Sequence, residues 1–341
     1  NRERLFMKKW KLGLSAALAS MLTLAACGNN NDNTSEPQQS DNNGNATQTY
    51  TIGLTQFVEH PSLDEATKGF KQAIADAGLQ VEYDEKNAQN DQNNTITIAQ
   101  NFVSQKVDLI FANATPSAQA AANATTEIPI IFTSVTDPVA ANLVESMEAP
   151  GSNVTGTADG HPDAIPNTMK FIAEQMGYQT VGTVYNAGEA NSATQIEIMN
   201  EEAKKYNLTV VEQSVSTSSE VKQAAEALVG KVDCIYIITD NTVVSALESV
   251  IQVATDKKLP LFVGELDSVK RGGFAAYGFN YYDIGYEAGK MAVQILKDGK
   301  SPSEIPALFP PNLALHINKT AAADMGVEIK ESEWTDAQYI E

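Results

Sequence analysis

The sequence predicts an α/β protein made of two doubly wound lobes, each built on a parallel sheet. Three observations support this fold class. Short β-rich runs alternate with helical patterns from residue 50 to residue 266. The β-rich runs are continuously apolar, which is typical of strands covered by helices on both faces. The order of elements also repeats after about 130 residues, so that VDLIFANATPSAQAA at 107–121 aligns with VDCIYIITDNTVVSA at 232–246.

The first half begins with a strand at 50–57 and a helix at 62–78, which ends at Gly78 after the last apolar residue in helical spacing. Further strands are expected at 79–87, 107–114 and 128–135. Helices are expected between them at 91–106 and 116–125. A single large sheet is the alternative arrangement, and the internal repeat favours two lobes instead.

The second half restarts the same order of elements. We expect its strands at 180–187, 208–216, 232–240 and 259–266. Its helices are expected around 196–206, around 224–229 and through Val250. The two halves together account for about 290 residues from Tyr50 onward, which suits two domains of ordinary size.

The first 26 residues have the pattern of a secretory signal peptide. Lys8, Lys9 and Lys11 precede an uncharged apolar run at 12–26, which is too short to span a membrane comfortably. Residues 1–6 precede Met7 and read as an upstream extension. The run ends in Leu-Ala-Ala-Cys, which resembles the lipobox of bacterial lipoproteins and implies lipidation (a palmitate-type anchor) at Cys27. An ordinary secretory signal with an unrelated cysteine is the alternative.

Residues 27–49 follow as an asparagine-rich segment almost without apolar side chains. Such a segment cannot bury enough apolar surface to fold, so we expect a disordered tether after the lipidated cysteine. The folded part would then be anchored to the cell membrane through lipid alone, on its extracytoplasmic face. No later stretch is apolar enough to span a bilayer.

Charge and composition exclude several classes of function. The formal net charge is −20, and removing the five basic and one acidic residues of the first 26 leaves about −24. This acidity argues against nucleic acid as a partner. His60, His161 and His316 are too scattered for a metal site, and no motif joins a nucleophile to a base. We therefore expect no cofactor, no metal and no enzyme, and no disulfide between the two cysteines.

Several stretches resemble one known family. QFVEHPSLDEATKGFKQAIADAG, FANATPSAQAA, TSVTDPVAA and YNAGEANSATQIE are similar to the ABC transporter substrate-binding family that includes tryptophan and tyrosine receptors. The resemblance implies two flavodoxin-like lobes of the periplasmic-binding-protein type I fold, joined by three hinge crossings. It implies a first lobe at 50–156 plus about 280–300, and a second at 157–279 plus about 301–341. Gly156, Gly160 and Gly278 would allow rotation at the crossings.

Ligands of open α/β sheets bind beyond the carboxyl ends of the strands. The loops there offer polar side chains from both halves of the sequence. In the first half the candidate ligand-binding residues are Gln56, His60, Leu63, Asp64, Thr115, Ser117, Ser134 and Asp137. In the second half they are Asn186, Glu189, Asn191, Asp240 and Asn241. Plain helix capping is the alternative role for most of them.

The residue types suit a small zwitterion. Ser117 follows Pro116 at an expected helix start, where free amide groups could hold a carboxylate. Asp137, Glu189 and Asp240 are candidates to hold an ammonium group. Arg271 is the only arginine after the signal peptide, which disfavours phosphate and dicarboxylates. Phe57, Tyr185 and Tyr281 could line an apolar pocket.

Together these features predict a monomeric, lipid-anchored receptor that closes on a small zwitterion, an aromatic or apolar amino acid. The family resemblance implies docking to an ABC permease with a separate ATPase. A sugar or nucleoside receptor of the same fold is one alternative. A ligand sensor for a signalling partner and a secreted enzyme on the same fold are two others.

Overall fold

The computed structural model describes residues 48–341. The signal peptide, Cys27 and most of the expected tether therefore lie outside the described residues. Within 48–341, no helix combines the length and apolar character needed to cross a membrane.

The first lobe is a five-stranded parallel sheet in the order β2-β1-β3-β4-β5. Its strands are β1 (Thr49–Gln56), β2 (Gln80–Asn87), β3 (Leu109–Asn113), β4 (Ile130–Val135) and β5 (Val154–Ala158). Strands β3, β4 and β5 are buried along their whole length and β1 is buried from Ile52 onward; the apolar runs of β3 and β4 are typical of strands covered by helices on both faces.

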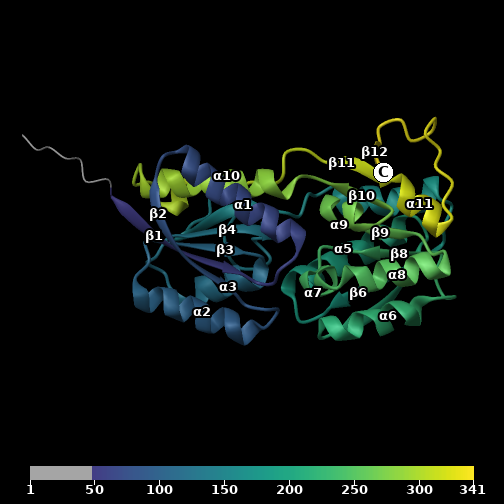
Figure 1. Cartoon of the computed structure of the whole chain (residues 1–341), viewed down its shortest axis with the longest axis horizontal. Coiled ribbons are helices and arrows are strands. Elements are labelled where there is room, and N and C mark those ends of the chain that lie inside the picture. Colours follow the sequence, from purple (N-terminus) through teal and green to yellow (C-terminus); the bar gives the residue numbers. More distant parts are fainter. Residues whose placement is uncertain (1–47) are drawn as a thin grey trace, which may run out of the picture. The chain divides into compact units, whose positions relative to one another are not determined.

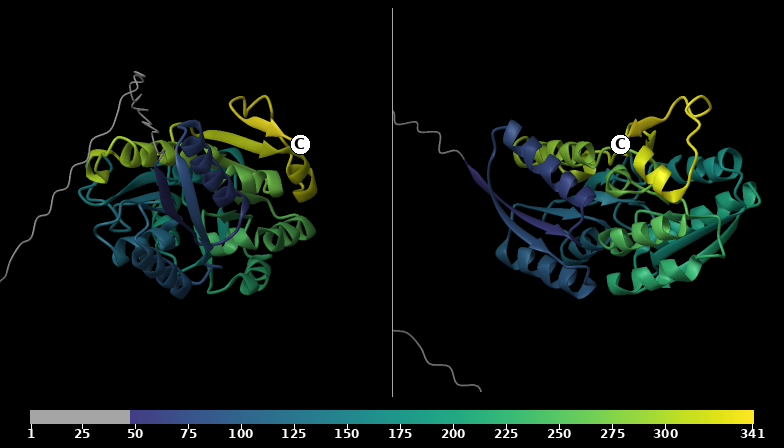
Figure 2. Two further views of the ribbon diagram at one scale, coloured as in Figure 1. Left: turned by 60° about the vertical axis from the view of Figure 1, so that its left-hand side comes forward. Right: turned by 45° about the vertical axis from the view of Figure 1, so that its right-hand side comes forward.

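Four helices cover this sheet (Figure 1). They are α1 (Pro61–Asp76), α2 (Gln92–Gln105), α3 (Thr115–Ala124) and α10 (Tyr281–Leu296). Phe102 of α2 and Ala118 of α3 pack in one apolar core with Phe132 of β4. Phe70 of α1 and Ala292 of α10 belong to a second core on the other face. The chain therefore returns late in the sequence to complete the first lobe, and α10 lies beside α1 in both ribbon figures (Figures 1 and 2).

The second lobe is a seven-stranded sheet in the order β12-β11-β10-β9-β8-β6-β7. Its strands are β6 (Thr180–Asn186), β7 (Thr209–Val215), β8 (Cys234–Ile237), β9 (Leu261–Val263), β10 (Ala275–Gly278), β11 (Ala314–Asn318) and β12 (Gln338–Ile340). All neighbours are parallel except β10 and β11. The predicted class, two doubly wound lobes with mostly parallel sheets, is confirmed.

Helices also surround the second sheet. They are α4 (Ala164–Lys170) with the π-helical turn η1 (Phe171–Gln175), α5 (Ala190–Lys205), the 3₁₀ turn η2 (Ser218–Glu220), α6 (Val221–Leu228), α7 (Asn241–Ser245), α8 (Leu247–Lys257), α9 (Leu266–Arg271) and α11 (Lys319–Met325). One continuous core joins this sheet to its helices. Trp334 packs into that core at 5.0 Å between ring centroids from Phe171, so the segment after α11 is part of the lobe.

Three segments connect the lobes. The chain leaves the first sheet after β5, at 159–163, and returns between β10 and α10, at 279–280. The third crossing lies after residue 308, later than the expected boundary near 301. The 3₁₀ turn η3 (Pro302–Glu304) and the residues after it stay with the first lobe, where Leu308 exchanges backbone hydrogen bonds of 2.8 and 3.0 Å with Ala158 and Gly156. This extended segment therefore pairs with backbone N–H and C=O groups on the edge of β5 that no other strand of the sheet reaches.

Gly156 and Gly160, which were expected to allow hinge rotation, lie where another stretch of backbone approaches too closely for a side chain. A Cβ on Gly160 would overlap the carbonyl oxygen of Thr136, and one on Gly156 would overlap the carbonyl oxygen of Phe132. The first crossing is therefore packed tightly against the end of β4. Asp159 and His161, on either side of Gly160, both line the cavity between the lobes.

Candidate functional site

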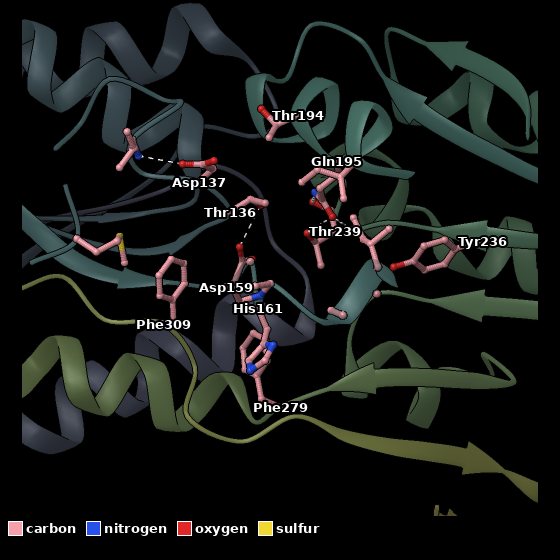
Figure 3. Close-up of a pocket in the computed structure, with 18 residues that line it drawn as sticks. Thr136, Asp137, Asp159, His161, Thr194, Gln195, Tyr236, Thr239, Phe279 and Phe309 are labelled. Carbon is pink, nitrogen blue, oxygen red and sulfur yellow. Dashed lines mark hydrogen bonds between the residues drawn. The ribbon is translucent and has the colours of Figure 1, made fainter. Parts of the chain in front are cut away.

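A cavity of about 320 Å³ lies between the carboxyl ends of the two sheets (Figure 3). Its wall combines the loop after β4, all three crossings, α5 and the ends of β8 and β9. The volume is at the lower end of the range of about 300–1,000 Å³ that is typical of small-molecule sites. The site therefore depends on both lobes.

Asp159 is the buried acidic side chain of this cavity. It lies on the first crossing and is 8% exposed. One carboxylate oxygen accepts a hydrogen bond of 3.1 Å from the Thr136 hydroxyl, and the other accepts one of 2.7 Å from the Tyr281 hydroxyl. Burial raises the pKa of Asp159 to about 6, and these two hydroxyl donors oppose that shift. At neutral pH the cavity therefore contains a desolvated negative charge.

Aromatic and aliphatic side chains form much of the remaining wall. Phe279 comes from the second crossing and Phe309 from the third, while Ile165 of α4 and Tyr236 of β8 belong to the second lobe. The Tyr236 hydroxyl points toward the cavity (Figure 3). Burial raises the pKa of Tyr236 to about 12, so this hydroxyl stays neutral and can donate a hydrogen bond. The apolar side chains of this wall can thus contact an apolar group, and the Tyr236 hydroxyl can donate a hydrogen bond to a polar atom on that group.

The second lobe adds a polar wall opposite Asp137 (Figure 3). Gln195 accepts hydrogen bonds of 3.2 and 2.9 Å from the backbone and hydroxyl of Thr239. His161 lines the cavity two residues after Asp159, and its Nδ1 accepts a hydrogen bond of 3.1 Å from the Asp163 amide. This contact holds the ring against its own loop.

Asp137 is the one predicted site residue among those described that lines this cavity. Its Oδ1 already accepts hydrogen bonds of 3.1 and 2.9 Å from the amides of Val139 and Ala140. The carboxylate therefore holds its own loop, and it is more exposed than Asp159.

Asp240 and Glu189 were expected to hold an ammonium group, and their contacts are instead those of capping residues. Asp240 accepts hydrogen bonds from the amides of Val243 and Asn186 and from the Ser192 hydroxyl, at 2.6–2.8 Å. Glu189 accepts from the amides and side chains of Asn241 and Thr242 at 2.6–3.2 Å. Both carboxylates therefore satisfy the amino end of α7. Burial raises the pKa of Asp240 to about 7.

Gln56 and Asp64 join β1 to the first turn of α1. Gln56 donates a hydrogen bond of 2.7 Å to Asp64 and accepts one of 2.9 Å from Thr67. Both side chains line a different, shallower pocket, which is formed with β2. Leu63 packs in the core beneath α2 and α3, and Asn186 lines a third pocket between Gln89–Gln92 and Ser214–Ser218. The structure therefore separates these four residues from the central cavity.

Five buried polar atoms near the strand ends have no hydrogen-bond partner among the described residues. They are His60 Nδ1, Asn113 Oδ1, Thr115 Oγ1, Ser134 Oγ and Asn191 Oδ1. The Ser62 hydroxyl instead acts on the Glu265 carboxylate, where it opposes the rise in pKa that burial causes. Ser117, which the sequence also indicated, lies beside these five atoms and accepts a hydrogen bond of 3.4 Å from Thr55. Burial lowers the pKa of His60 to about 4, so its ring is neutral. Buried polar groups are normally paired, so these atoms indicate room for a polar guest.

The sequence prediction missed Asp159, Tyr236, Gln195 and Phe279. Asp159 and Phe279 lie in the two stretches that were interpreted as hinge crossings. A crossing segment necessarily runs along the space between the lobes, so polar and aromatic residues on it were available as candidates. Tyr236 and Gln195 gave no such signal, because one lies in an apolar strand and the other in a helix.

The fold defines the class: the chain has the periplasmic-binding-protein type I fold. It belongs to the family described as ABC transporter substrate binding protein, whose model matches residues 51–339. A tyrosine-binding protein of Clostridioides difficile (strain R20291) is 46% identical over 273 residues, which cover 79% of this chain and 78% of that protein.

Two solved structures extend the comparison. An ABC domain from Streptococcus pneumonia in complex with L-Trp is 34% identical, with a TM-score of 0.81, and the match covers 86% of this chain and all of that one. The ligand-free, open structure of a substrate-binding protein from Clostridium difficile is 40% identical, with a TM-score of 0.63, over 86% of this chain and 99% of that one. The chain is thus similar in structure to proteins of known open and ligand-bound states.

Proposed function

We propose that this protein captures an aromatic amino acid between its lobes and presents it to an ABC importer. The observation that carries the proposal is the buried Asp159 carboxylate in a cavity lined by Phe279 and Tyr236. A desolvated carboxylate next to aromatic rings matches an ammonium group attached to an aromatic side chain. The L-Trp complex and the tyrosine-binding relative support this ligand class.

The ammonium group is assigned to Asp159. Its oxygens each accept one hydroxyl hydrogen bond, from Thr136 and Tyr281, and each retains a further lone pair for a ligand donor. A ligand cation here would compensate the buried charge and lower the pKa of Asp159 from about 6. Binding is therefore expected to favour neutral over acidic pH.

For the carboxylate of the ligand we propose the unpartnered hydroxyls at the ends of β3 and β4, although neither is part of the lining of the 320 Å³ cavity. Thr115 and Ser134 are both buried, and neither hydroxyl has a partner among residues 48–341. Asn113 and Thr133 pair directly across β3 and β4. Thr115 begins α3 just after β3, and Ser134 is the penultimate residue of β4, so the two hydroxyls lie near neighbouring strand ends. Hydroxyl donors would hold a carboxylate without an arginine.

The arrangement of the lobes supports capture by closure. Gln92 of the first lobe donates a hydrogen bond of 2.8 Å to the Gly188 carbonyl, and Asn90 Oδ1 lies 3.0 Å from the Thr242 hydroxyl, whose proton is donated to Glu189. The higher TM-score with the L-Trp complex than with the open structure, despite lower identity, agrees with a closed form. A ligand that contacts both lobes favours this state.

The test is a thermal-shift and calorimetric screen against the twenty amino acids, common sugars and nucleosides. We expect Tyr or Trp to raise the melting temperature by mass action. Asp159→Asn should weaken that binding at least about 30-fold, because removing one partner of a buried charge pair costs about 2–5 kcal/mol. Asp137→Asn removes the same charge from the same cavity and should change affinity less than about threefold.

Other outcomes would change the proposal. A shift only with a sugar or nucleoside would retain the receptor and overturn the amino acid. Equal losses in the Asp159 and Asp137 variants would contradict the assignment of the ammonium group. We propose no catalytic step, since solute binding accounts for the site.

The cellular setting belongs to the same proposal. We infer that Cys27 is lipidated after signal cleavage, that residues 28–49 tether the lobes to the outer face of the cell membrane, and that a permease with a separate ATPase receives the ligand. The support is the signal-like sequence together with membership of the ABC transporter family. Metabolic palmitate labelling should mark the wild-type protein and not Cys27→Ser, and labelling of both would contradict lipidation at this residue.

A further inference from the structure

We propose that Tyr281 is a positioning residue that orients Asp159 and Phe279 together for the ligand. This inference rests on the proposed role of Asp159. The sequence indicated Tyr281 as a pocket-lining aromatic residue, whereas Phe279 is the ring from this segment that lines the cavity. Tyr281 lies behind it, 2% exposed, at the first position of α10.

Two contacts join Tyr281 to the cavity wall. Its hydroxyl donates a hydrogen bond of 2.7 Å to Oδ2 of Asp159. Its ring stacks on Phe279 with centroids 5.3 Å apart and planes inclined by 19°. One side chain on the second crossing therefore supports both the charged and the aromatic part of the site, and it ties them to the rigid start of a sixteen-residue helix.

The hydroxyl pair around Asp159 fixes the plane of the carboxylate. Thr136 donates to Oδ1 from the loop after β4, and Tyr281 donates to Oδ2 from α10. With one donor on each oxygen, the side chain cannot rotate without breaking a hydrogen bond in a buried site. The remaining lone pairs are thereby directed at a defined place, which is what a receptor needs to discriminate an ammonium group by geometry.

The charged and polar groups that face Asp159 set its pKa, and this pKa decides how the affinity of the protein for the ligand depends on pH. Tyr281 on α10 and Thr136 after β4 lower its pKa by hydrogen bonding, whereas the charge of Glu265, which follows β9, raises it. His161 and Asp137 line the same cavity. The charge of Asp267, on α9, contributes to the raised pKa of Tyr281. Burial raises the pKa of Tyr281 well above its usual value, so its hydroxyl remains a donor throughout.

Tyr281→Phe removes the donor and retains the ring that stacks on Phe279. We expect the pKa of Asp159 to rise, because a hydrogen bond to its charged form is lost. The acid limb of a plot of affinity for Tyr or Trp against pH should then move up by about half a unit, so that affinity falls about threefold at pH 5 and stays close to that of the wild type at pH 8.5. Tyr281→Leu also removes the stack, so its loss should persist at every pH.

The control is Tyr282→Phe, which makes the same change at the next residue. Its ring stacks on Tyr286 and not on the cavity wall, so the pH profile should match that of the wild type. A second readout needs no ligand: the ¹³C titration of the Asp159 carboxyl group, assigned by its loss in Asp159→Asn, should move in Tyr281→Phe alone.

The outcomes separate this inference from the proposed function. An unchanged Asp159 titration in Tyr281→Phe, or an equal shift in Tyr282→Phe, would overturn the positioning role. A shifted titration in a protein that binds no aromatic amino acid would overturn the proposed ligand and still support the contact between Tyr281 and Asp159.

Discussion

Glu265 shows at the residue scale how burial controls charge in this cleft. It follows β9 at the carboxyl edge of the second sheet, is 2% exposed, and accepts a hydrogen bond of 2.6 Å from Ser268. Burial raises its pKa to about 7, although the Ser268 hydroxyl opposes the shift. The usual pKa of a glutamate is 4.5. Between pH 4.5 and pH 7 the folded protein therefore keeps a proton on Glu265 that the unfolded chain has released.

This difference predicts that Glu265 favours folding more at low pH. Its contribution is full below about pH 4.5 and is lost as the pH rises through 7, because the folded state must then release its proton or bury a charge. About 2.5 pKa units correspond to about 3 kcal/mol. Urea unfolding at pH 5.5 and pH 8 should show a smaller difference for Glu265→Gln than for the wild type, whereas the exposed Glu59→Gln should behave like the wild type. An equal difference in all three proteins would contradict a raised pKa.

Single residues are also where the structure adds most to the sequence. Asp240, Glu189 and Asp159 all follow strands and look alike in the sequence. Asp240 and Glu189 are satisfied by the amino end of α7, while Asp159 has only hydroxyl partners and a cavity in front of it. The distinction depends on which groups the fold brings together, and a strand-end acid in sequence carries no information about that.

At the scale of elements, the contact between α1 and α10 closes the first lobe. A Cβ on Gly285 would overlap the carbonyl oxygen of Ala66, and a Cβ on Gly289 would lie 2.6 Å from the Cβ of Ala73. The GYEAGK stretch, which superficially resembles a phosphate-binding loop, is therefore the interior of a helix that approaches its neighbour closely.

This contact predicts a stability effect that is specific to one face of α10. Gly285→Ala should destabilise the protein by about 1–3 kcal/mol, because the added methyl group forces two backbones apart. Lys290→Ala on the exposed face of the same helix should change stability by less than about 0.5 kcal/mol. Denaturant midpoints for both variants provide the test, and a neutral or stabilising Gly285→Ala would show that the helices are not in close contact.

The elements that the sequence predicted are the ones with strong local patterns. The apolar strands β1, β3, β4, β6, β8 and β9 and the periodic helices were found because burial on both faces leaves a continuous apolar run. Strands β5 and β10 were interpreted only as crossings, and β12 was not anticipated. These strands have three to five residues, and their pairing depends on which sheet edge the chain reaches.

At the scale of the whole described molecule, closure depends on few polar contacts between the lobes. Gln92 of α2 donates its 2.8 Å hydrogen bond to the Gly188 carbonyl across the cleft, from an exposed position. Such a bond contributes about 0.5–1.5 kcal/mol. Its loss should act on the closed state and leave each lobe intact.

We therefore expect Gln92→Ala to speed ligand release about two- to tenfold, with little change in the denaturant midpoint. Gln72→Ala is the matched control, since Gln72 is exposed on α1 and bonds only to Asp76 of its own helix among the described residues. Stopped-flow dissociation of bound Tyr or Trp measures the effect. Equal release rates in the two variants would show that this contact does not hold the lobes together.

The most direct measurement is a calorimetric cycle of two ligands and two proteins: L-tyrosine and its des-amino analogue 3-(4-hydroxyphenyl)propionate, each titrated into wild type and Asp159→Asn. If Asp159 holds the ligand's ammonium group, the variant loses most of its affinity for tyrosine and little for the analogue, with a coupling energy of at least about 1.5 kcal/mol. A coupling energy near zero, with both ligands weakened equally, would contradict the account.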